Sequence, residues 1–456
     1  MKKNRTVILV TILGLIFVAT LFNWQEWFLN NKRKHVTHEE QELLEKIAED
    51  TYRFFEEFTD PDTGLPLDRV DFENGVTMAE HTSPTNIAMY LASTIAAAEM
   101  DIITHEEAKE KIDITLATLQ KMEKWNGLYY NWYYTEDGSL KTDWGQFIST
   151  VDNGWLTIAL VATGQFYPEK ANIIEELVNN ADYSKLYDPN VGLMWGGYDV
   201  AEGKYTAHHY GMLYSETRGA SYVAIGKGDV PETHWWKMYR TMSPEDSNQS
   251  QQPQGQWVNI DGVDVYEGHY EYNGIRYVPS WGGSMFEALM PQLFIKEKEL
   301  GENALGLNNQ RHVEGQIKYA KEKEYEAWGF SPAAIKNGYQ EFGVKVLGAS
   351  GYEDHATVTP HASILALEYD PATVIDNIQV LMDLGVYGDF GFYDTIHLPT
   401  KEVAKTYLAL DQGMIMISIT NFLQDGVIRD YFHNDPIGKG PEHLLERETF
   451  SIVDQK

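Results

Sequence analysis

Two segments of this 456-residue chain carry residue types that could do chemistry on a sugar, residues 214–218 (YSETR) and 280–287 (SWGGSMFE). A carboxyl group such as that of Glu216 can pass a proton to a leaving oxygen. A flat indole such as that of Trp281 can lie against the apolar face of a pyranose ring. Taken alone, such segments are more typical of a solvated Glu216 and Arg218 and a core Trp281, so the interpretation depends on other parts of the chain.

The composition narrows the class of ligand. Acidic residues number 68 against 36 basic ones, and the net charge of −32 argues against nucleic-acid binding because a phosphate backbone would be repelled. The chain has 28 Tyr, 18 Phe and 12 Trp, and its Trp-Tyr clusters at 125–134 and 195–198 favour a carbohydrate groove. It has no cysteine, which excludes disulfides, thiol catalysis and cysteine-ligated metals.

The first 35 residues resemble a membrane-targeting segment. Lys2, Lys3 and Arg5 precede an apolar stretch at 6–22, which is at the short end of the roughly 17–25 residues that cross a bilayer. No small-x-small cleavage site follows it, so we expect an uncleaved signal anchor in the cell membrane with residues 36–456 outside as one domain. A cleaved signal and a secreted protein are the alternative, and the basic cluster at 32–34 opposes the expected orientation.

The rest of the chain is patterned as helices. Apolar residues at helical spacing predict helices over 39–58, 83–100, 106–124, 153–165, 169–180, 214–225, 284–293, 308–324, 359–367, 371–384 and 405–423. Short alternating runs at 263–266 and 275–278 predict one or two small β-hairpins. So many evenly spread helices favour a single all-α domain, most naturally an α/α toroid, with a solenoid or an irregular bundle as alternatives.

Several segments together resemble a known family. Residues 81–87 (HTSPTNI) and 149–154 (STVDNG) resemble landmarks of a module in cyclic β-1,2-glucan synthases. Residues 214–216, running on to 228–231, are similar to the "YNE…LGSP" stretch of the glucoamylase-like domain family, and 280–291 to its "SWSGSMFEYLMP" stretch. Residues 388–394 are similar to its "GxyGFYD" segment and 410–413 to its "DQG" helix start. That family includes the endo-β-1,2-glucanases of glycoside hydrolase family 144, and the resemblance covers about residues 40–440 in the same order.

The resemblance implies an (α/α)6 toroid with a central active-site cleft, attack on β-linked glucan without metal or organic cofactor, and an inverting reaction. The chain departs from the family at Ser215, where asparagine is usual, and at 217–219, which puts the identity of the substrate in doubt more than the mechanism.

Glycoside cleavage needs one carboxylic acid that protonates the departing oxygen and one carboxylate that activates water or attacks carbon. Glu216 is our candidate for the proton donor, by its match to the motif glutamate and its aromatic neighbours. The base is ranked Asp411, then Asp152, then Asp394. Asp411 begins an apolar helix, whose backbone N–H groups should hold it ionised, although a simple N-cap role is nearly as good an interpretation.

Sugar contacts are expected from a set of aromatic and polar side chains, each of which taken alone is more typical of packing or turn chemistry: Trp281, Asp394, Gln412, Tyr214, Trp144, Trp195 and Asn86. Glu287 is interpreted as a buried structural acid. Residues 353–355 (EDH) and the adjacent His208 and His209 raise the question of a metal, but neither has a partner at ligand spacing, so we expect no metal site.

The leading hypothesis is therefore an endo-acting glycoside hydrolase of β-1,2-glucan or a related exopolysaccharide. The alternatives are a transglycosylase or a hydrolase of another polymer, and a non-catalytic glycan-binding protein on a degenerate hydrolase scaffold. The presence of Glu216 argues against degeneration. The sequence does not indicate an oligomeric state.

Overall fold

The computed structural model describes residues 36–336 and 338–453. The chain divides into two units, Met1–Leu43 and Leu44–Lys456, and the second contains nearly all of the described helices and strands. The predicted membrane anchor lies outside the described residues. Within the described ranges, the helices are too short or too polar to cross a membrane.

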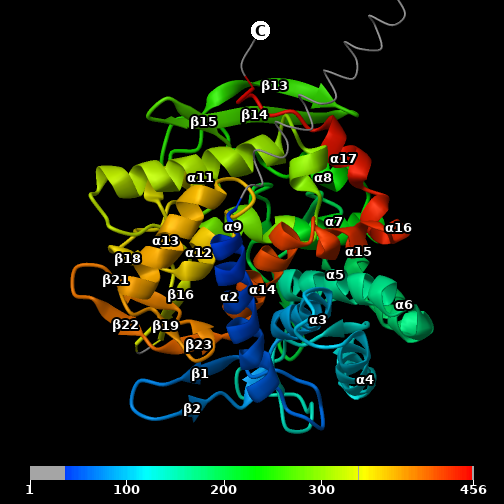
Figure 1. The fold of residues 1–456 in the computed structure, drawn as a ribbon. Coiled ribbons are helices and arrows are strands. Elements are labelled where there is room, and N and C mark those ends of the chain that lie inside the picture. The colour runs from blue at the N-terminus through cyan, green and yellow to red at the C-terminus, as the bar shows by residue number, and fades with distance from the viewer. Residues whose placement is uncertain (1–35, 337, 454–456) are drawn as a thin grey trace, which may run out of the picture. The chain divides into compact units, whose positions relative to one another are not determined.

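Helices dominate the fold (Figure 1). The α-helices are α2 (His38–Glu57), α3 (Pro84–Glu99), α4 (His105–Lys121), α5 (Thr150–Phe166), α6 (Ala171–Asn180), α7 (Arg218–Gly226), α8 (Thr233–Lys237), α9 (Met285–Leu289), α10 (Glu297–Leu300), α11 (Leu305–Glu322), α12 (Pro360–Ile364), α13 (Pro371–Asp383), α14 (Ala409–Leu423), α15 (Val427–His433), α16 (Pro436–Lys439) and α17 (Glu442–Arg447). Short 3-10 helices are η1 (Pro168–Lys170), η2 (Tyr183–Leu186), η3 (Met290–Leu293) and η4 (Lys345–Leu347).

Three helices, α3, α5 and α14, are apolar on all sides and form the centre of the core. Nearly every residue of each is buried, as expected for a helix without a polar face. The helices α4 and α6 bury one side only and pack on α3 and α5, and α13 likewise packs on α12, which packs on α14. Ser83 and Ser149 cap α3 and α5 by accepting hydrogen bonds from the backbone N–H groups of Asn86 and Asp152. The result is an inner set of buried helices with amphipathic helices around it.

Two glycines let the inner helices approach closely. A Cβ at Gly154 of α5 would lie 2.4 Å from the Cβ of Ala220 in α7. One at Gly413 of α14 would lie 2.4 Å from the Cβ of Met89 in α3. Since real Cβ atoms do not approach to this distance, both positions require glycine, and they fix the spacing of the helices that carry the site.

The strands are short, and they lie in the connections between helices. They are β1 (Arg69–Asp71), β2 (Thr77–Met78), β3 (His81–Thr82), β4 (Lys124–Trp125), β5 (Leu128–Tyr129), β6 (Tyr133–Tyr134), β7 (Phe147–Ser149), β8 (Tyr187–Asp188), β9 (Leu193–Trp195), β10 (Gly197–Asp199), β11 (Lys204–Tyr205), β12 (His209–Tyr210), β13 (Gln254–Ile260), β14 (Val263–Tyr272), β15 (Ile275–Tyr277), β16 (Ala333–Ile335), β17 (Gly338–Gln340), β18 (Thr357–Val358), β19 (Tyr387–Gly388), β20 (Gly391–Phe392), β21 (Thr395–His397), β22 (Glu402–Ala404) and β23 (Thr406–Leu408). All named pairs are antiparallel; the longest sheet is the meander β13-β14-β15, and β1 pairs with the distant β23.

The helix-rich prediction is confirmed, and so is the hairpin predicted around 263–278. Two predicted helix starts are wrong. The helix predicted from 405 begins only at Ala409, because residues 406–408 form strand β23, which pairs with β1. The helix predicted from 214 begins only at Arg218, because the Ser215 hydroxyl accepts from the Thr217 N–H and the Ser215 carbonyl accepts from the Arg218 N–H, which together form a turn.

Candidate active site

Acidic side chains gather at the N-terminal ends of helices from distant parts of the chain. Asp152, Glu287 and Asp411 are each the third residue of their helix, α5, α9 and α14, and Glu216 lies in the turn before α7. Negative charge from Glu287 and Asp152 acts on Glu216. Glu216, Glu287 and Asp152 are therefore close enough to influence one another's protonation, as the parts of one site.

Glu216 lines a cavity of about 920 Å³ and is half-buried. Glu287 and Trp281 line the same cavity, as do aromatic side chains from other parts of the chain: Tyr210, Tyr239, Trp257, Tyr266 and Tyr352. Burial raises the pKa of Glu216, and the neighbouring Glu287 raises it further. A carboxylic acid that keeps its proton near neutral pH, open to an aromatic-lined cavity, is the group that a glycosidase needs as proton donor.

Glu287 is held more firmly than Glu216. Its carboxylate accepts hydrogen bonds from the Ser280 hydroxyl at 2.7 Å, from the Gly282 N–H at 2.9 and 3.0 Å, and from the Ser284 N–H at 3.3 Å. With Ser284 it forms a capping box at the start of α9. Burial raises the pKa of Glu287, and these donors oppose the rise. Glu287 is thus a structural acid, as predicted, and it also faces the cavity beside Glu216.

Arg218 anchors the backbone of both glutamate segments. It is fully buried and forms a two-bond ion pair with Glu297, Nε to Oε1 at 2.6 Å and Nη2 to Oε2 at 2.9 Å. Its remaining N–H groups donate to the carbonyls of Ser215 at 2.9 Å, Glu287 at 3.1 Å and Ala288 at 2.7 Å. The guanidinium therefore fixes the residue before Glu216 relative to the start of α9.

Asp152 is half-buried and accepts a hydrogen bond from the Thr85 hydroxyl at 2.6 Å. The side-chain amide of Asn131 satisfies both of its neighbours when its nitrogen faces Asp152. The nitrogen then donates to Asp152 Oδ2 at 3.1 Å, and the oxygen accepts from Trp132 Nε1 at 3.2 Å. Burial raises the pKa of Asp152 although it lies in the first turn of α5. The site thus continues from Glu216 through Asp152 toward Trp132.

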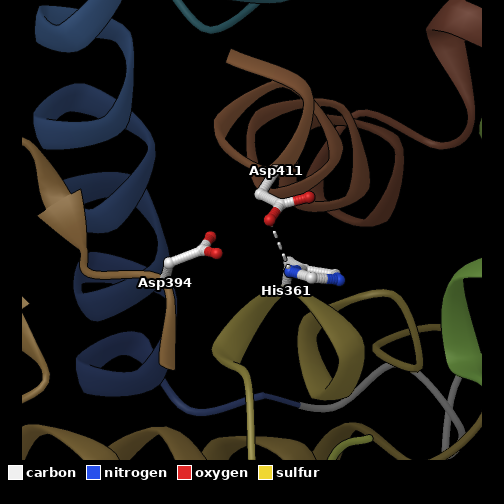
Figure 2. Close-up of side chains that lie close together, drawn as sticks. All are labelled: His361, Asp394 and Asp411. Atoms are coloured by element: carbon white, nitrogen blue, oxygen red, sulfur yellow. Dashed lines mark ion pairs between the residues drawn. The ribbon is translucent and has the colours of Figure 1, made fainter. Parts of the chain in front are cut away.

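Asp394 and Asp411 lie together with His361 (Figure 2). Asp411 and His361 come from the starts of α14 and α12, Asp394 comes from the residue before β21, and all three are almost fully buried. His361 Nδ1 lies 3.3 Å from Asp411 Oδ2 and 2.9 Å from the Thr359 hydroxyl. Burial lowers the pKa of His361, so its imidazole is neutral and does not compensate the two carboxyl groups.

The helix start does not keep the pKa of Asp411 low, so the prediction of a readily ionised carboxylate is corrected. Burial raises the pKa of Asp411, and burial together with the charge of Asp411 raises the pKa of Asp394 well above its ordinary value. A helix N-terminus contributes at most about 2 kcal/mol, which is less than the cost of burying two adjacent carboxylates. Asp411 is also not the N-cap, since Leu408 holds that position.

Within the part of the chain that the structure describes, His361, Asp394 and Asp411 are the group that could hold a metal. One ligand atom from each lies within 4.8 Å of the others, and Asp394 Oδ1 and Asp411 Oδ2 are buried without a hydrogen-bond partner. Two carboxylates and an imidazole suit a divalent cation. However, Thr359 already occupies His361 Nδ1, the ring nitrogen that faces Asp411, and His361 Nε2 has no partner to orient the ring. A proton shared by the carboxyl groups of Asp394 and Asp411 accounts for their close approach as well as a metal ion would.

Tyr339 connects the two acidic groups. The negative charges of Asp411, Asp394, Asp68 and Glu216 all act on its hydroxyl, and with burial they raise its pKa well above the ordinary value. The charges of acids from four segments of the chain therefore act on the Tyr339 hydroxyl, although the residue as a whole is 53% exposed.

Three predicted sugar contacts are buried elsewhere. Tyr214 is fully buried, donates to Asn309 at 2.8 Å and lies under the Arg218 guanidinium. Gln412 donates to the Phe392 carbonyl at 3.0 Å, and Asn86 donates to Asp68 at 2.7 Å. All three bury their side chains in the packing that supports the site, and their contact with a sugar stays a prediction.

The predicted tryptophans fall in three different places. Trp281 lines the cavity and is 39% exposed. Trp195 stacks on His209, a lining residue, with ring centroids 3.7 Å apart, and is not itself among the lining residues. Trp144 is exposed and packs edge-on against His81 and Trp132, outside this cavity but toward Asp68, which lies 3.6 Å from His81.

Sequence reasoning missed several residues of the site. The role of Glu287 in the cavity, beyond that of a structural acid, follows from its place three residues into a helix that begins beside Trp281, a signal present in the SWGGSMFE motif. His361 and Tyr339 carry no local signal, since only long-range packing brings them to the acids.

Comparison with known proteins defines the class. The profile of the family described as "Putative glucoamylase" matches residues 208–436, half of the chain, and that of a protein family of unknown function matches 46–265. The chain belongs to this glucoamylase-like family, as the motifs predicted.

The names of several similar proteins specify β-1,2-linked glucans. The chain is 25% identical to the cyclic beta-(1,2)-glucan synthase NdvB of Rhizobium meliloti, over 93% of the chain and 19% of the synthase. It is 20% identical to an exo beta-1,2-glucooligosaccharide sophorohydrolase of Parabacteroides distasonis, over 89% of the chain and 58% of that protein. The endo-beta-1,2-glucanase of Chitinophaga pinensis shares the fold, with a TM-score of 0.72 and 16% identity over 90% of the chain and 98% of that structure. The chain therefore spans about a fifth of the synthase and somewhat over half of the sophorohydrolase.

Proposed function

We propose that this chain is a glycoside hydrolase that cleaves β-linked glucan, with Glu216 as the proton donor. The observation that carries the proposal is the position of Glu216 beside Glu287 in a cavity of about 920 Å³ that aromatic side chains line. The negative charge of Glu287 favours the protonated form of Glu216, and the aromatic walls suit pyranose rings.

The substrate is proposed to be β-1,2-glucan, with internal cleavage of the chain. The support is that the relatives above, a synthase and two hydrolases, all carry this linkage in their names. The inner and outer helices are consistent with an (α/α)6 ring, which we propose as the complete architecture.

Three aspartates are proposed as candidates for the base of an inverting reaction: Asp411, Asp152 and Asp394. Accessibility favours Asp152, which is half-buried and acts on Glu216, whereas Asp394 and Asp411 are each 2% exposed and do not line the cavity. Replacing each by glycine and adding azide separates them. The true base variant alone should recover turnover, with a glycosyl azide of inverted configuration as the product.

A transglycosylase is the second candidate function, and Glu287 is the observation that favours it. A retaining enzyme needs two carboxyl groups only about 5–5.5 Å apart, and Glu287 is the carboxyl that most strongly affects Glu216. Glu287 would then attack the sugar and a second glucan could replace water. First-formed products of the same anomeric configuration as the substrate, and chains longer than the substrate, would support this function.

The experiment for the main proposal compares Glu216→Gln with Glu175→Gln, an exposed glutamate on α6, on linear β-1,2-glucan. The first variant should lose cleavage and keep glycan binding, and the second should behave as the wild type. Cleavage by the Glu216→Gln variant at the wild-type rate would remove Glu216 from the mechanism. A wild type that binds glucan without cleaving it would move the chain to the glycan-binding class.

For location we propose the cell envelope, with residues 1–35 as a signal anchor and the second unit outside the cell. The support is the charged start and apolar run of the sequence. Protease added to intact cells should degrade the second unit; protection until the cells are lysed would contradict this.

A further inference from the structure

Several exposed apolar side chains line the cavity in addition to Glu216 and Glu287. Of the large apolar side chains that are exposed in the described part of the chain, Val191, Tyr239, Trp257 and Trp281 line this one cavity. Trp257 is the most exposed of them, at 60%. Exposed apolar surface gathered in one hollow is typical of a ligand site.

Trp257 lies on β13, an edge strand of the meander β13-β14-β15. Its register partner across the sheet is Tyr266, and the two rings pack with centroids 5.4 Å apart. Asp264, two residues before Tyr266 on the same face, also lines the cavity and accepts a hydrogen bond from Asn259. This face therefore offers a broad aromatic surface with a carboxylate beside it.

The face is separate from the place where cleavage is proposed. Trp281 precedes Gly282, whose N–H donates a hydrogen bond to Glu287. Trp281 therefore lies beside the acidic side chains proposed to cleave the substrate. Trp257 belongs to a hairpin that packs on α8, and Figure 1 shows β13 and β14 at one edge of the second unit with α9 nearer its middle. The volume of about 920 Å³ is near the upper end of the roughly 300–1,000 Å³ of ligand pockets, which leaves room for more than the reacting sugar.

We propose that Trp257 is the stacking platform of a remote subsite that holds a sugar unit of a long glucan chain away from the cleaved bond, with Asp264 accepting hydrogen bonds from its hydroxyls. The inference rests on the proposed function, since it takes the ligand to be the glucan substrate. An indole has only two rotatable side-chain bonds, so it offers a large contact area at low entropic cost.

A remote platform acts on binding and leaves the chemistry alone. Its contact with the sugar is the same before and at the transition state, so its loss should raise KM and leave kcat unchanged. For a substrate too short to reach β13, the replacement of Trp257 should leave KM unchanged. The chain-length dependence of KM therefore separates this role from a structural one.

The experiment uses the full chain with Trp257→Ala, Trp257→Phe and, as a control, Ile114→Ala, an exposed apolar residue on α4 that does not line the cavity. For long linear β-1,2-glucan, Trp257→Ala should raise KM about 3- to 10-fold with kcat unchanged. For the shortest oligosaccharide that is cleaved, KM should not move. Trp257→Phe should restore part of the loss, and the control should match the wild type for both substrates.

Two results would overturn the platform while leaving the proposed function intact: an unchanged KM for the long glucan, or an equal rise for both substrates. If the wild type cleaves no glucan, the binding of β-1,2-, β-1,3-, β-1,4- and α-glucans in affinity gels decides. Retardation that Trp257→Ala abolishes would support the platform although the proposed function fails. Retardation that Trp257→Ala leaves unchanged, or no retardation, would overturn it.

Discussion

Replacing Glu297 by glutamine is expected to be among the most damaging single changes in the protein. Arg218 and Glu297 are both fully buried, and the carboxylate accepts two hydrogen bonds from the guanidinium and a third from Asn309 at 2.9 Å. The amide of glutamine would remove the negative charge and leave the Arg218 cation without compensation. Breaking one side of such a buried pair costs about 3–5 kcal/mol, against about 0–1 kcal/mol for a surface pair.

The change should also reduce activity in the fraction that folds. Arg218 donates to the carbonyls of Ser215 and Glu287, so a displaced guanidinium loosens the turn that carries Glu216 and the start of α9 together. We therefore expect kcat to fall below the wild-type value at temperatures where the variant is still folded.

The assay is urea-induced unfolding monitored by tryptophan fluorescence, with Glu299→Gln as the matched control. Glu299 lies on the same helix, α10, but is half-exposed and 3.6 Å from Arg429, so its loss should change the unfolding free energy by less than about 1 kcal/mol. If Glu297→Gln unfolds within about 1 kcal/mol of the wild type, Arg218 is not the anchor that the geometry indicates.

Four further predictions concern the site. Trp281→Ala should raise KM for β-1,2-glucan; an unchanged KM and kcat would return Trp281 to a packing role. Because the negative charge of Glu287 raises the pKa of Glu216, Glu287→Gln should move the alkaline limb of the remaining kcat/KM to lower pH, and a limb that stays in place would contradict the coupling. Asp394 and Asp411 have raised pKa values when folded, so the folded state keeps protons that the unfolded chain releases; the unfolding free energy should fall as pH rises from about 4 toward those raised values, and Asp411→Asn should flatten the fall. Dialysis against a chelator should leave the melting temperature unchanged if these two acids share a proton, and a drop reversed by added zinc or manganese would assign a metal to them.

Local signals in the sequence predicted the elements that carry the site. The helix α3 begins where Ser83-Pro84 predicted, because the serine side chain caps it and proline suits its first turn. Glu287 is the structural acid that the motif at 280–287 predicted, since the capping box at the start of α9 is a local structure.

Long-range contacts determine the features of the fold and site that the sequence did not predict. The buried partner of Arg218 lies 79 residues away in the chain, and β23 exists because it pairs with β1 over 300 residues earlier. The raised pKa of Asp411 was mispredicted for the same reason: the helix start is local, but the burial that outweighs it is tertiary, and it also outweighs a hydrogen bond with Asp394 that lowers this pKa.

The measurement that tests the central claim most directly is the identification, by NMR, of the first products that the full chain forms from linear β-1,2-glucan, beside the Glu216→Gln variant. We predict short β-1,2-linked oligosaccharides from the wild type alone, with β-1,3-, β-1,4- and α-glucans untouched. Cleavage of another glucan in preference would overturn the proposed linkage. The same products from the Glu216→Gln variant would contradict the role of Glu216 as the proton donor.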